Sequence, residues 1–221
     1  MPFSPVDNPH ILTTRYRCSA AWEPGAAILK RKIEFAAGRW CAVQAIRSLE
    51  PSNKGEVGIR SDRAPQWPEG LVGSITHTEG FASAAVARAD EWWSLGIDSE
   101  RIEGTEIPSA ALDLALRAEE WHLDRGSLSE AQSLWLIFSA KESIYKCLYP
   151  LVGRAFDYSA VILEKIDPTS GTFYFRLAEA LAPEFPVSYR SQGRFEFSRG
   201  CVHTGVELQR LEDGRRRRSL S

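Results

Sequence analysis

Four charged side chains in two short segments carry the clearest chemical signal in this sequence. Glu142 and Lys146 are four positions apart in a largely apolar stretch, so in a helix their side chains lie on one face. Asp98 and Glu100 alternate at the end of another apolar stretch, so in a strand their side chains point the same way. Three carboxylates and one cation are a set that suits a divalent metal ion holding a phosphate.

Each pair also has an ordinary structural interpretation. A Glu–Lys pair at this spacing stabilises any exposed helix by about 0.2–0.5 kcal/mol, and an acidic pair at a strand end can simply be solvated. However, the face that carries Glu142 begins at Trp135 and adjoins an apolar stripe. A partly buried carboxylate there needs a cation or a metal ion as its partner.

Thr76 and His77 are a second candidate for phosphate binding. They close a predicted strand and precede the turn Thr78–Gly80. The hydroxyl, the imidazole and the backbone N–H groups of the loop can all donate to phosphate oxygens. A structural histidine bonded to a loop carbonyl is the alternative, and the residues alone leave it open.

Basic residues outside the C-terminal tail concentrate in one predicted helix and in the loop that follows it. The guanidinium group is a planar fork that matches phosphate oxygens, whereas a helix face that is merely solvated is the alternative. The candidates are Lys30, Arg31, Arg39, Arg60 and Arg63. Together with the carboxylates and the Thr-His pair, they describe a site for a polyphosphate with Mg2+.

Periodicity in the sequence predicts the elements that must position these residues. Apolar residues at helical spacing predict helices over residues 26–49, 109–124 and 129–148, with Ser129 as the N-cap of the last and Pro150 as its stop. Pro and Gly residues predict a loop over residues 50–70 and a domain seam at 104–108. The predicted strands are residues 71–76, 82–88, 92–98, 159–163, 172–177, 194–198 and 201–208.

Composition limits the class of protein. The chain has 221 residues, 43% of them hydrophobic and 25% charged, and its net charge of -2 gives no general attraction to nucleic acid or membranes. It has no run of 18 apolar residues and no signal-peptide pattern, so we expect a cytoplasmic protein. The four cysteines show no CxxC spacing, which argues against zinc. We expect Arg215–Arg218 to belong to a solvated tail.

The two halves of the chain have a similar order of predicted elements. Each reads as a helix and then strands, and each contains a strand rich in small residues, Phe81–Val86 and Cys201–Val206. Such strands are common, so the pattern alone leaves an internal duplication open. We divide the chain into an N-terminal subdomain of residues 1–103, a C-terminal subdomain of residues 104–213 and a basic tail of residues 214–221.

The order of the motifs resembles that of the Sfp-type 4'-phosphopantetheinyl transferases over about residues 15–205. Arg63–Pro68 followed by Gly73–His77 looks like the first signature of that family. Gly96–Glu100 resembles the second signature and Phe138–Lys146 the third. Glu34–Arg39 is similar to a helix typical of the branch that includes enterobactin synthase component D.

The resemblance implies an α+β fold of two similar halves related by a pseudo-twofold axis, with coenzyme A in the cleft between them. It implies transfer of 4'-phosphopantetheine from coenzyme A to a serine of an apo acyl or peptidyl carrier protein, with release of 3',5'-ADP. We expect a monomer that binds neither nucleic acid nor membrane. The implied ligands of Mg2+ are Asp98, Glu100 and Glu142. The implied catalytic residues are Asp98, Glu142 and Lys146, with Glu142 as the candidate base. The implied ligands of coenzyme A are Arg31, Arg39, Arg60, Arg63, Thr76, His77 and Lys146.

Two other functions stay open at this point. A Mg2+-dependent phosphohydrolase of a nucleotide or of coenzyme A would use the same carboxylates with water as the nucleophile. A non-catalytic coenzyme A-binding protein would have lost Glu142 or Lys146, and both are present. The predicted helix 109–124, with Arg117 and Trp121, is one candidate surface for the carrier protein, and core packing is its alternative. Siderophore, nonribosomal peptide, polyketide and fatty acid synthesis all remain open as the pathway.

Overall fold

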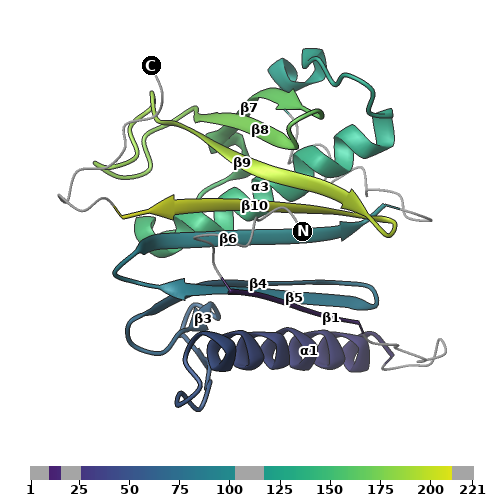
Figure 1. The fold of residues 1–221 in the computed structure, drawn as a ribbon. Coiled ribbons are helices and arrows are strands. Elements are labelled where there is room, and N and C mark those ends of the chain that lie inside the picture. The colour runs from purple at the N-terminus through teal and green to yellow at the C-terminus, as the bar shows by residue number, and fades with distance from the viewer. Residues whose placement is uncertain (1–9, 16–25, 103–116, 211–221) are drawn as a thin grey trace.

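The structure, a computed structural model, describes residues 10–15, 26–102 and 117–210 of the chain. One long helix and a three-stranded antiparallel sheet form its first layer, with the strand order β1-β5-β4. A two-stranded ribbon, β2 with β3, lies in the loop after the helix. The elements are β1 (His10–Arg15), α1 (Ala26–Leu49), β2 (Gly58–Ile59), β3 (Pro65–Gln66), β4 (Leu71–Thr78) and β5 (Phe81–Arg88). Figure 1 shows α1 lying along one side of this sheet.

A five-stranded antiparallel sheet and a second long helix form the other layer. Its strand order is β6-β10-β9-β8-β7, and α3 packs on β6 and β10. The elements are β6 (Trp92–Arg101), the 3-10 helix η1 (Ala118–His122), α3 (Glu130–Val152), the 3-10 helix η2 (Tyr158–Ala160), β7 (Val161–Asp167), β8 (Thr172–Leu177), β9 (Arg190–Ser198) and β10 (Cys201–Gln209). The fold is therefore a mixture of helix and antiparallel sheet, as expected.

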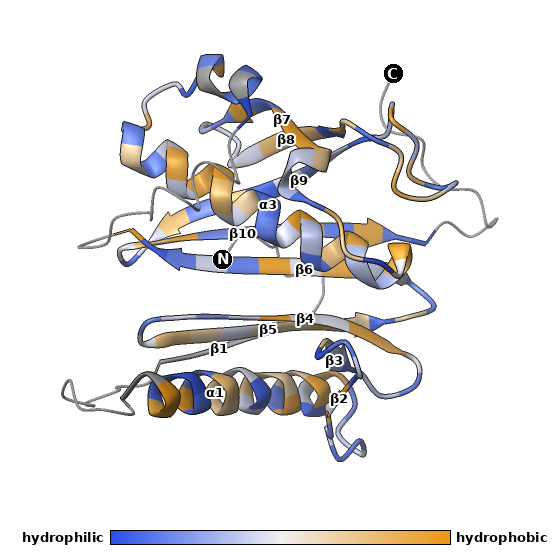
Figure 2. Cartoon of the chain, turned by 180° about the vertical axis from the view of Figure 1, so that it is seen from behind, coloured by the Kyte–Doolittle hydropathy of each residue, from blue (hydrophilic) through white to orange (hydrophobic). Residues whose placement is uncertain are grey.

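The two layers have cores of different kinds. Small residues dominate where α1 meets its sheet: Cys41 and Ala42 on the helix pack on Ala82 and Ala84 of β5. Large side chains fill the space between α3 and the five-stranded sheet, where Phe173 is fully buried. Figure 2 shows hydrophobic and hydrophilic bands alternating along α1 and apolar residues along much of α3. Small residues allow α1 to approach its sheet closely, and aromatic burial supplies much of the stability of the second layer.

The helix α3 begins as the sequence predicts and ends later. Ser129 forms a capping box with Gln132, whose backbone N lies 3.2 Å from the Ser129 hydroxyl. The expected stop at Pro150 is wrong, because the helix continues through Pro150 to Val152. Pro150 lacks an N–H to donate within the helix, yet it lies in the last turn of α3, which continues for two more residues. The end comes at Gly153, which adopts a φ of 72° and donates its N–H to the Tyr149 carbonyl at 2.9 Å.

A line of hydroxyl groups joins the two layers at the seam between β4 and β6. These two strands belong to different sheets, yet alternate hydroxyl side chains of β4 accept hydrogen bonds from alternate backbone N–H groups of β6. The accepting and donating pairs are Ser74 with Ile97 at 3.0 Å, Thr76 with Ser99 at 3.0 Å and Thr78 with Arg101 at 3.3 Å. At this seam, hydroxyl oxygens therefore accept the backbone N–H hydrogen bonds that carbonyl oxygens accept inside a sheet.

Gly96 allows α3 to lie directly on β6. A Cβ atom at this position would meet the Ser143 carbonyl oxygen at 1.9 Å and the Cys147 backbone N at 2.6 Å. Ser94 strengthens the same contact by donating to the Cys147 carbonyl at 2.6 Å. The close approach matters for the site because Glu142 and Lys146 lie on α3 and Asp98 lies on β6.

Most predicted elements are confirmed, with longer bounds for several strands. The helix over residues 26–49 is confirmed, and the strand over 172–177 appears as β8. The strand β1 was not predicted. The predicted helix over 109–124 is wrong in its final part, where residues 118–122 form only the 3-10 helix η1. The rest of that helix, the seam at 104–108 and the basic tail lie outside the described residues. The pseudo-twofold relation of the two halves stays a prediction.

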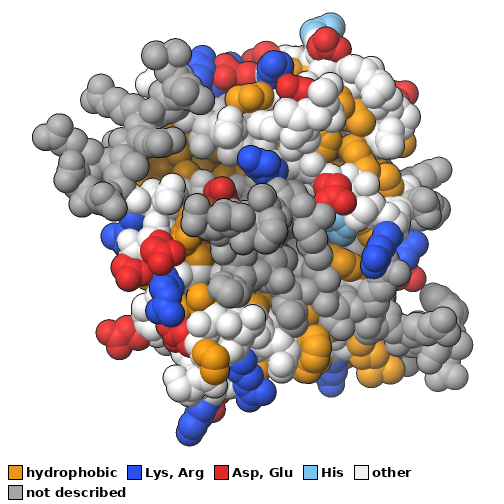
Figure 3. All heavy atoms as spheres, viewed as in Figure 1, with side chains coloured by type: hydrophobic (Ala, Val, Ile, Leu, Met, Phe, Trp, Pro, Cys, Tyr) orange, Lys and Arg blue, Asp and Glu red, His pale blue; other side chains and the backbone are white. Residues whose placement is uncertain are grey.

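The described helices also bear on membrane association. None of them carries a stretch that is both long enough and apolar enough to cross a bilayer. Acidic and basic side chains are interspersed over the described part of the face in Figure 3. That face offers no broad patch of one charge, which agrees with the net charge of -2.

Candidate active site

Asp98 is the centre of the hydrogen-bonded cluster at the seam. Only 3% of its surface is exposed, and both carboxylate oxygens have partners. Oδ1 accepts from the Thr76 hydroxyl at 3.2 Å and from Lys146 Nζ at 2.6 Å, and Oδ2 accepts from the Ser139 hydroxyl at 2.8 Å. A buried carboxylate needs hydrogen-bond partners, and Asp98 has three donors, one of them cationic.

Lys146 links β6 to the acidic face of α3. Its Nζ lies 2.6 Å from Asp98 Oδ1 and 3.9 Å from Glu142 Oε2, and 29% of its side chain is exposed. Burial acts to lower the pKa of Lys146, but Asp98 and Glu142 outweigh it and leave that pKa raised. Lys146 is therefore a cation at neutral pH, and its exposed part can contact an anion that enters from outside.

Glu142 lies one helical turn before Lys146 and has a second partner outside the helix. Its Oε1 accepts a hydrogen bond from the hydroxyl of Tyr158 in η2. Burial raises the pKa of Glu142 and Asp98 adds to the rise, while Lys146 and Tyr158 oppose it. A carboxylate with a raised pKa is a stronger base than an ordinary surface glutamate.

Glu100 is the third acidic member of the cluster. Burial raises the pKa of Glu100 to about 8, and the charges of Asp98 and Glu142 add to the rise. Asp98, Glu100 and Glu142 therefore interact electrostatically across β6 and α3, as the sequence predicts. Lys146 offsets only part of this repulsion.

The three carboxylates do not form a ready-made metal cage. Within residues 10–15, 26–102 and 117–210, no group of three or more His, Cys, Asp or Glu side chains is arranged to hold a metal ion. Lys146 instead contacts Asp98 directly. The donor set nevertheless fits Mg2+, because oxygen ligands are what this ion prefers and a divalent cation would relieve the repulsion that raises the pKa of Glu100.

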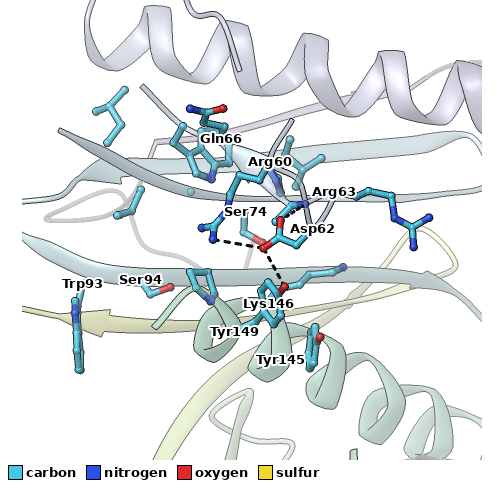
Figure 4. A pocket seen from close by; sticks show the side chains of 18 residues that line it. Arg60, Asp62, Arg63, Gln66, Ser74, Trp93, Ser94, Tyr145, Lys146 and Tyr149 are labelled. Atoms are coloured by element: carbon cyan, nitrogen blue, oxygen red, sulfur yellow. Dashed lines mark hydrogen bonds and ion pairs between the residues drawn. The ribbon is translucent and has the colours of Figure 1, made fainter. Parts of the chain in front are cut away.

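A cavity of about 580 Å3 opens beside this cluster. Its lining residues come from the loop after β2, from β3 and β4, from the start of β6 and from α3, and Figure 4 shows their side chains next to α3. Lys146, Tyr145 and Tyr149 line it from α3, and the residues of the loop include Arg60 and Arg63. The lining of the cavity thus includes cationic groups, of which Lys146 also contacts the carboxylate cluster, and aromatic rings. This combination suits a phosphate-bearing ligand with an apolar part.

Asp62 ties the loop to α3 across this cavity. Its Oδ2 accepts from the Tyr149 hydroxyl at 2.9 Å and lies 3.4 Å from Arg60 Nη2. Figure 4 shows Arg60 and Tyr149 reaching Asp62 from different sides, while the Arg63 side chain extends away from it. Arg63 has a φ of 69°, an unusual backbone conformation for a residue other than glycine.

Two predicted phosphate ligands on α1 lie apart from the carboxylate cluster. Arg39 donates to the backbone carbonyls of Val57 at 2.8 Å and Gly58 at 2.6 Å, and its guanidinium lies 5.0 Å from the Phe35 ring centroid. In this arrangement Arg39 holds the loop that carries β2. Arg31 is exposed on the same helix.

Thr76 and His77 are neighbours in the chain but lie on opposite faces of β4. The Thr76 hydroxyl is directed to Asp98 and to the backbone N–H of Ser99. His77 Nδ1 instead lies 3.6 Å from Glu34 Oε2 on α1. Burial lowers the pKa of His77 despite the opposing charge of Glu34, so the imidazole is neutral at pH 7. Thr76 therefore joins the carboxylate cluster and His77 does not.

Three contacts of the site were not predicted from the sequence. Tyr158 bonds Glu142, Tyr149 bonds Asp62, and Ser139 donates to Asp98. Helical spacing already put Ser139 on the same face as Glu142, so its position could have been foreseen. Tyr158 lies beyond the end of α3, and nothing in the local pattern marks it.

Family models match both halves of the chain. The model of the 4'-phosphopantetheinyl transferase N-terminal domain matches residues 24–87. The model of the 4'-phosphopantetheinyl transferase superfamily matches residues 94–197. The second range includes Asp98, Glu100, Glu142 and Lys146.

Curated proteins with similar sequences carry related names. The 4'-phosphopantetheinyl transferase Svp of Streptomyces mobaraensis is 39% identical over 198 residues, which span 82% of this chain and 74% of that protein. The 4'-phosphopantetheinyl transferase PptT of Mycobacterium tuberculosis is 34% identical over 191 residues, with 82% of this chain and 81% of that protein covered. Enterobactin synthase component D of Salmonella typhi is 40% identical over 121 residues, or 53% of this chain and 48% of that protein.

Proposed function

The chain belongs to the 4'-phosphopantetheinyl transferase superfamily, and we propose that it transfers the 4'-phosphopantetheine group of coenzyme A to a serine of an apo carrier protein. The observation that carries this proposal is the contact of Lys146 on α3 with Asp98 on β6, next to Glu142 and beside the cavity. It combines an anion-binding cation with a proton acceptor at the mouth of a space for the ligand.

In the proposed reaction, the serine oxygen attacks the β-phosphorus of coenzyme A. A new serine–phosphorus ester bond forms, the bond to the bridging pyrophosphate oxygen breaks, and 3',5'-ADP leaves. Glu142 accepts the serine proton, directly or through a water, which its raised pKa supports. Lys146 offsets negative charge on the phosphoryl oxygens, and the partial exposure of its side chain, which lines the cavity, supports this role.

We propose that Mg2+ takes part, held by Asp98, Glu100 and Glu142. The electrostatic coupling of these carboxylates and the elevated pKa of Glu100 support them as its ligands. Bound Mg2+ supplies Lewis-acid stabilisation of charge on the phosphates. Ser139 and Thr76 orient Asp98 through hydrogen bonds, as partners of metal ligands do.

Coenzyme A is proposed to bind in the cavity, with its phosphates near the cationic wall. Arg60, Arg63 and Lys146 line that cavity, which supports them as phosphate ligands. Arg31, Arg39 and His77, on α1 and β4, are proposed for the 3'-phosphate at the outer end. Arg39 would then exchange its two backbone carbonyl partners for phosphate oxygens.

We further propose that the enzyme is a cytoplasmic monomer whose two halves are related by a pseudo-twofold axis. Carrier proteins of siderophore synthesis are one candidate substrate, since enterobactin synthase component D is among the similar proteins. Carriers of nonribosomal peptide, polyketide and fatty acid synthesis are the others.

A panel of apo carrier proteins, incubated with coenzyme A and Mg2+, tests the proposed function. Intact-protein mass spectrometry should show the mass of one phosphopantetheine arm added to at least one carrier, with 3',5'-ADP released in equal amount. Release of inorganic phosphate without any carrier modification would contradict the transferase and support a phosphohydrolase.

A further inference from the structure

Tyr158 is the donor to Glu142 that comes from outside α3. Its hydroxyl donates to Glu142 Oε1, whereas the other oxygen, Oε2, lies 3.9 Å from Lys146 Nζ. The two oxygens of one carboxylate therefore have different tasks. One is anchored to η2, and the other faces the cation that contacts Asp98.

Several contacts hold Tyr158 itself. The Asp157 side chain caps η2 by accepting the Ser159 backbone N–H at 2.8 Å. Arg117 donates to the Ser159 carbonyl, and the Tyr158 ring lies 6.3 Å from the ring centroid of Phe138 on α3. A donor held on both sides by backbone and ring contacts is a fixed point against which a longer side chain can be oriented.

Glutamate needs such a fixed point more than aspartate does. Glu142 has three rotatable side-chain bonds, and a salt bridge to Lys146 at 3.9 Å does not select one orientation. A hydrogen bond to one carboxylate oxygen does select an orientation, because it leaves the other oxygen directed into the site.

We propose that Tyr158 is a positioning residue, whose hydroxyl holds Oε1 of Glu142 so that Oε2 stays directed at the centre formed by Asp98 and Lys146. The inference rests on the proposed role of Glu142 in transfer and metal binding. Tyr158 touches neither the substrate nor the reacting atoms; it acts through Glu142.

The variant Tyr158→Phe removes the hydroxyl and keeps the ring on Phe138. We expect kcat for transfer to fall by about tenfold to a hundredfold, the usual effect of losing a partner of a metal ligand. The KM for coenzyme A should be unchanged, because the cavity lining is untouched. Affinity for Mn2+ alone, measured by electron paramagnetic resonance, should fall by a similar factor. Tyr174→Phe, on β8 in the sheet away from the cavity, is the matched control and should change none of these.

A double-mutant comparison separates positioning from general stability. In a Glu142→Gln background, Tyr158→Phe should cause no further loss of Mn2+ affinity, because the side chain it positions has already lost its charge. An equal loss in both backgrounds, or wild-type kcat and Mn2+ affinity in Tyr158→Phe, would overturn the inference. Failure of the wild-type protein to modify any carrier would instead count against the proposed function, and the Mn2+ comparison would still decide the role of Tyr158.

Discussion

The hydroxyl of Thr76 lies 3.2 Å from Oδ1 of Asp98 and also accepts the backbone N–H of Ser99 at 3.0 Å. One side chain of β4 therefore both fixes the central carboxylate and joins the two layers of the fold. The sequence suggests Thr76 as a phosphate ligand, and in the structure its hydroxyl is hydrogen-bonded to Asp98.

Thr76→Val tests this double role with little change in shape. Valine leaves the buried Ser99 N–H without its acceptor and Asp98 without one donor, so we expect a loss of about 1–3 kcal/mol in the free energy of unfolding. Thr76→Ser keeps the hydroxyl and should lose much less. Urea denaturation of the two variants measures the difference, and equal stability of the two would show that the hydroxyl does not hold the seam.

A buried ion pair supports α3 next to the site. Lys141 Nζ lies 2.7 Å from Glu120 Oε2, and the exposed surface of these residues is 1% and 0%. Lys141→Met leaves a buried carboxylate without its cation, and we expect a loss of about 3–5 kcal/mol in the free energy of unfolding. Lys54→Met, in an exposed loop, should change it by less than about 0.5 kcal/mol. Denaturant titrations that gave the same stability for both variants would contradict this account of the pair.

The bond between Tyr149 and Asp62 spans the cavity, so we expect it to slow the release of coenzyme A. Tyr149→Phe removes a hydrogen bond of 2.9 Å at the surface of the protein, so dissociation should accelerate by about two- to tenfold. Stopped-flow displacement of bound coenzyme A measures this rate. Asp62→Ala removes the acceptor and should have a similar effect, and the double variant should add nothing further. Fully additive effects would mean that the two residues act separately.

Much of the fold could be predicted because hydrophobic periodicity is local. Apolar residues at helical spacing predicted the helix over 26–49, where Ala42 and Ile46 are buried but Ile28 and Phe35 are exposed. The strand 172–177 has apolar residues facing the core. The strand β1 has the sequence His10–Arg15, without clear alternation, and it forms only by pairing with β5. Whether such a segment forms a strand depends on the strand with which it pairs, and the local sequence does not show this.

Local periodicity also predicted which acidic side chains share a face, but it did not predict all of their hydrogen-bond partners. Helical spacing put Glu142 and Lys146 on one face, and strand alternation put Asp98 and Glu100 on another. Alternation also implies that Thr76 and His77 point in opposite directions, and the structure gives them different partners, Asp98 and Glu34. The contact of Tyr158 with Glu142 could not be predicted, because the path of the chain after Gly153 depends on tertiary packing.

Asp98→Ala should abolish Mg2+-dependent activity. The change removes a proposed ligand and leaves Lys146 without its nearest anion. We expect transfer to fall by at least about a hundredfold and to lose its response to added Mg2+. Asp90→Ala, at an exposed turn before β6, serves as the control. A Mg2+ titration curve of Asp98→Ala with the wild-type midpoint would remove Asp98 from the metal site.

Replacement of Glu142 tests the central claim most directly. Glu142→Gln keeps the size of the side chain and removes its capacity to accept the serine proton. In an assay with coenzyme A, Mg2+ and an apo carrier that the wild-type enzyme modifies, mass spectrometry should show no phosphopantetheine added by the variant. Calorimetry should show that the variant still binds coenzyme A in part. Transfer by Glu142→Gln at the wild-type rate would contradict the account.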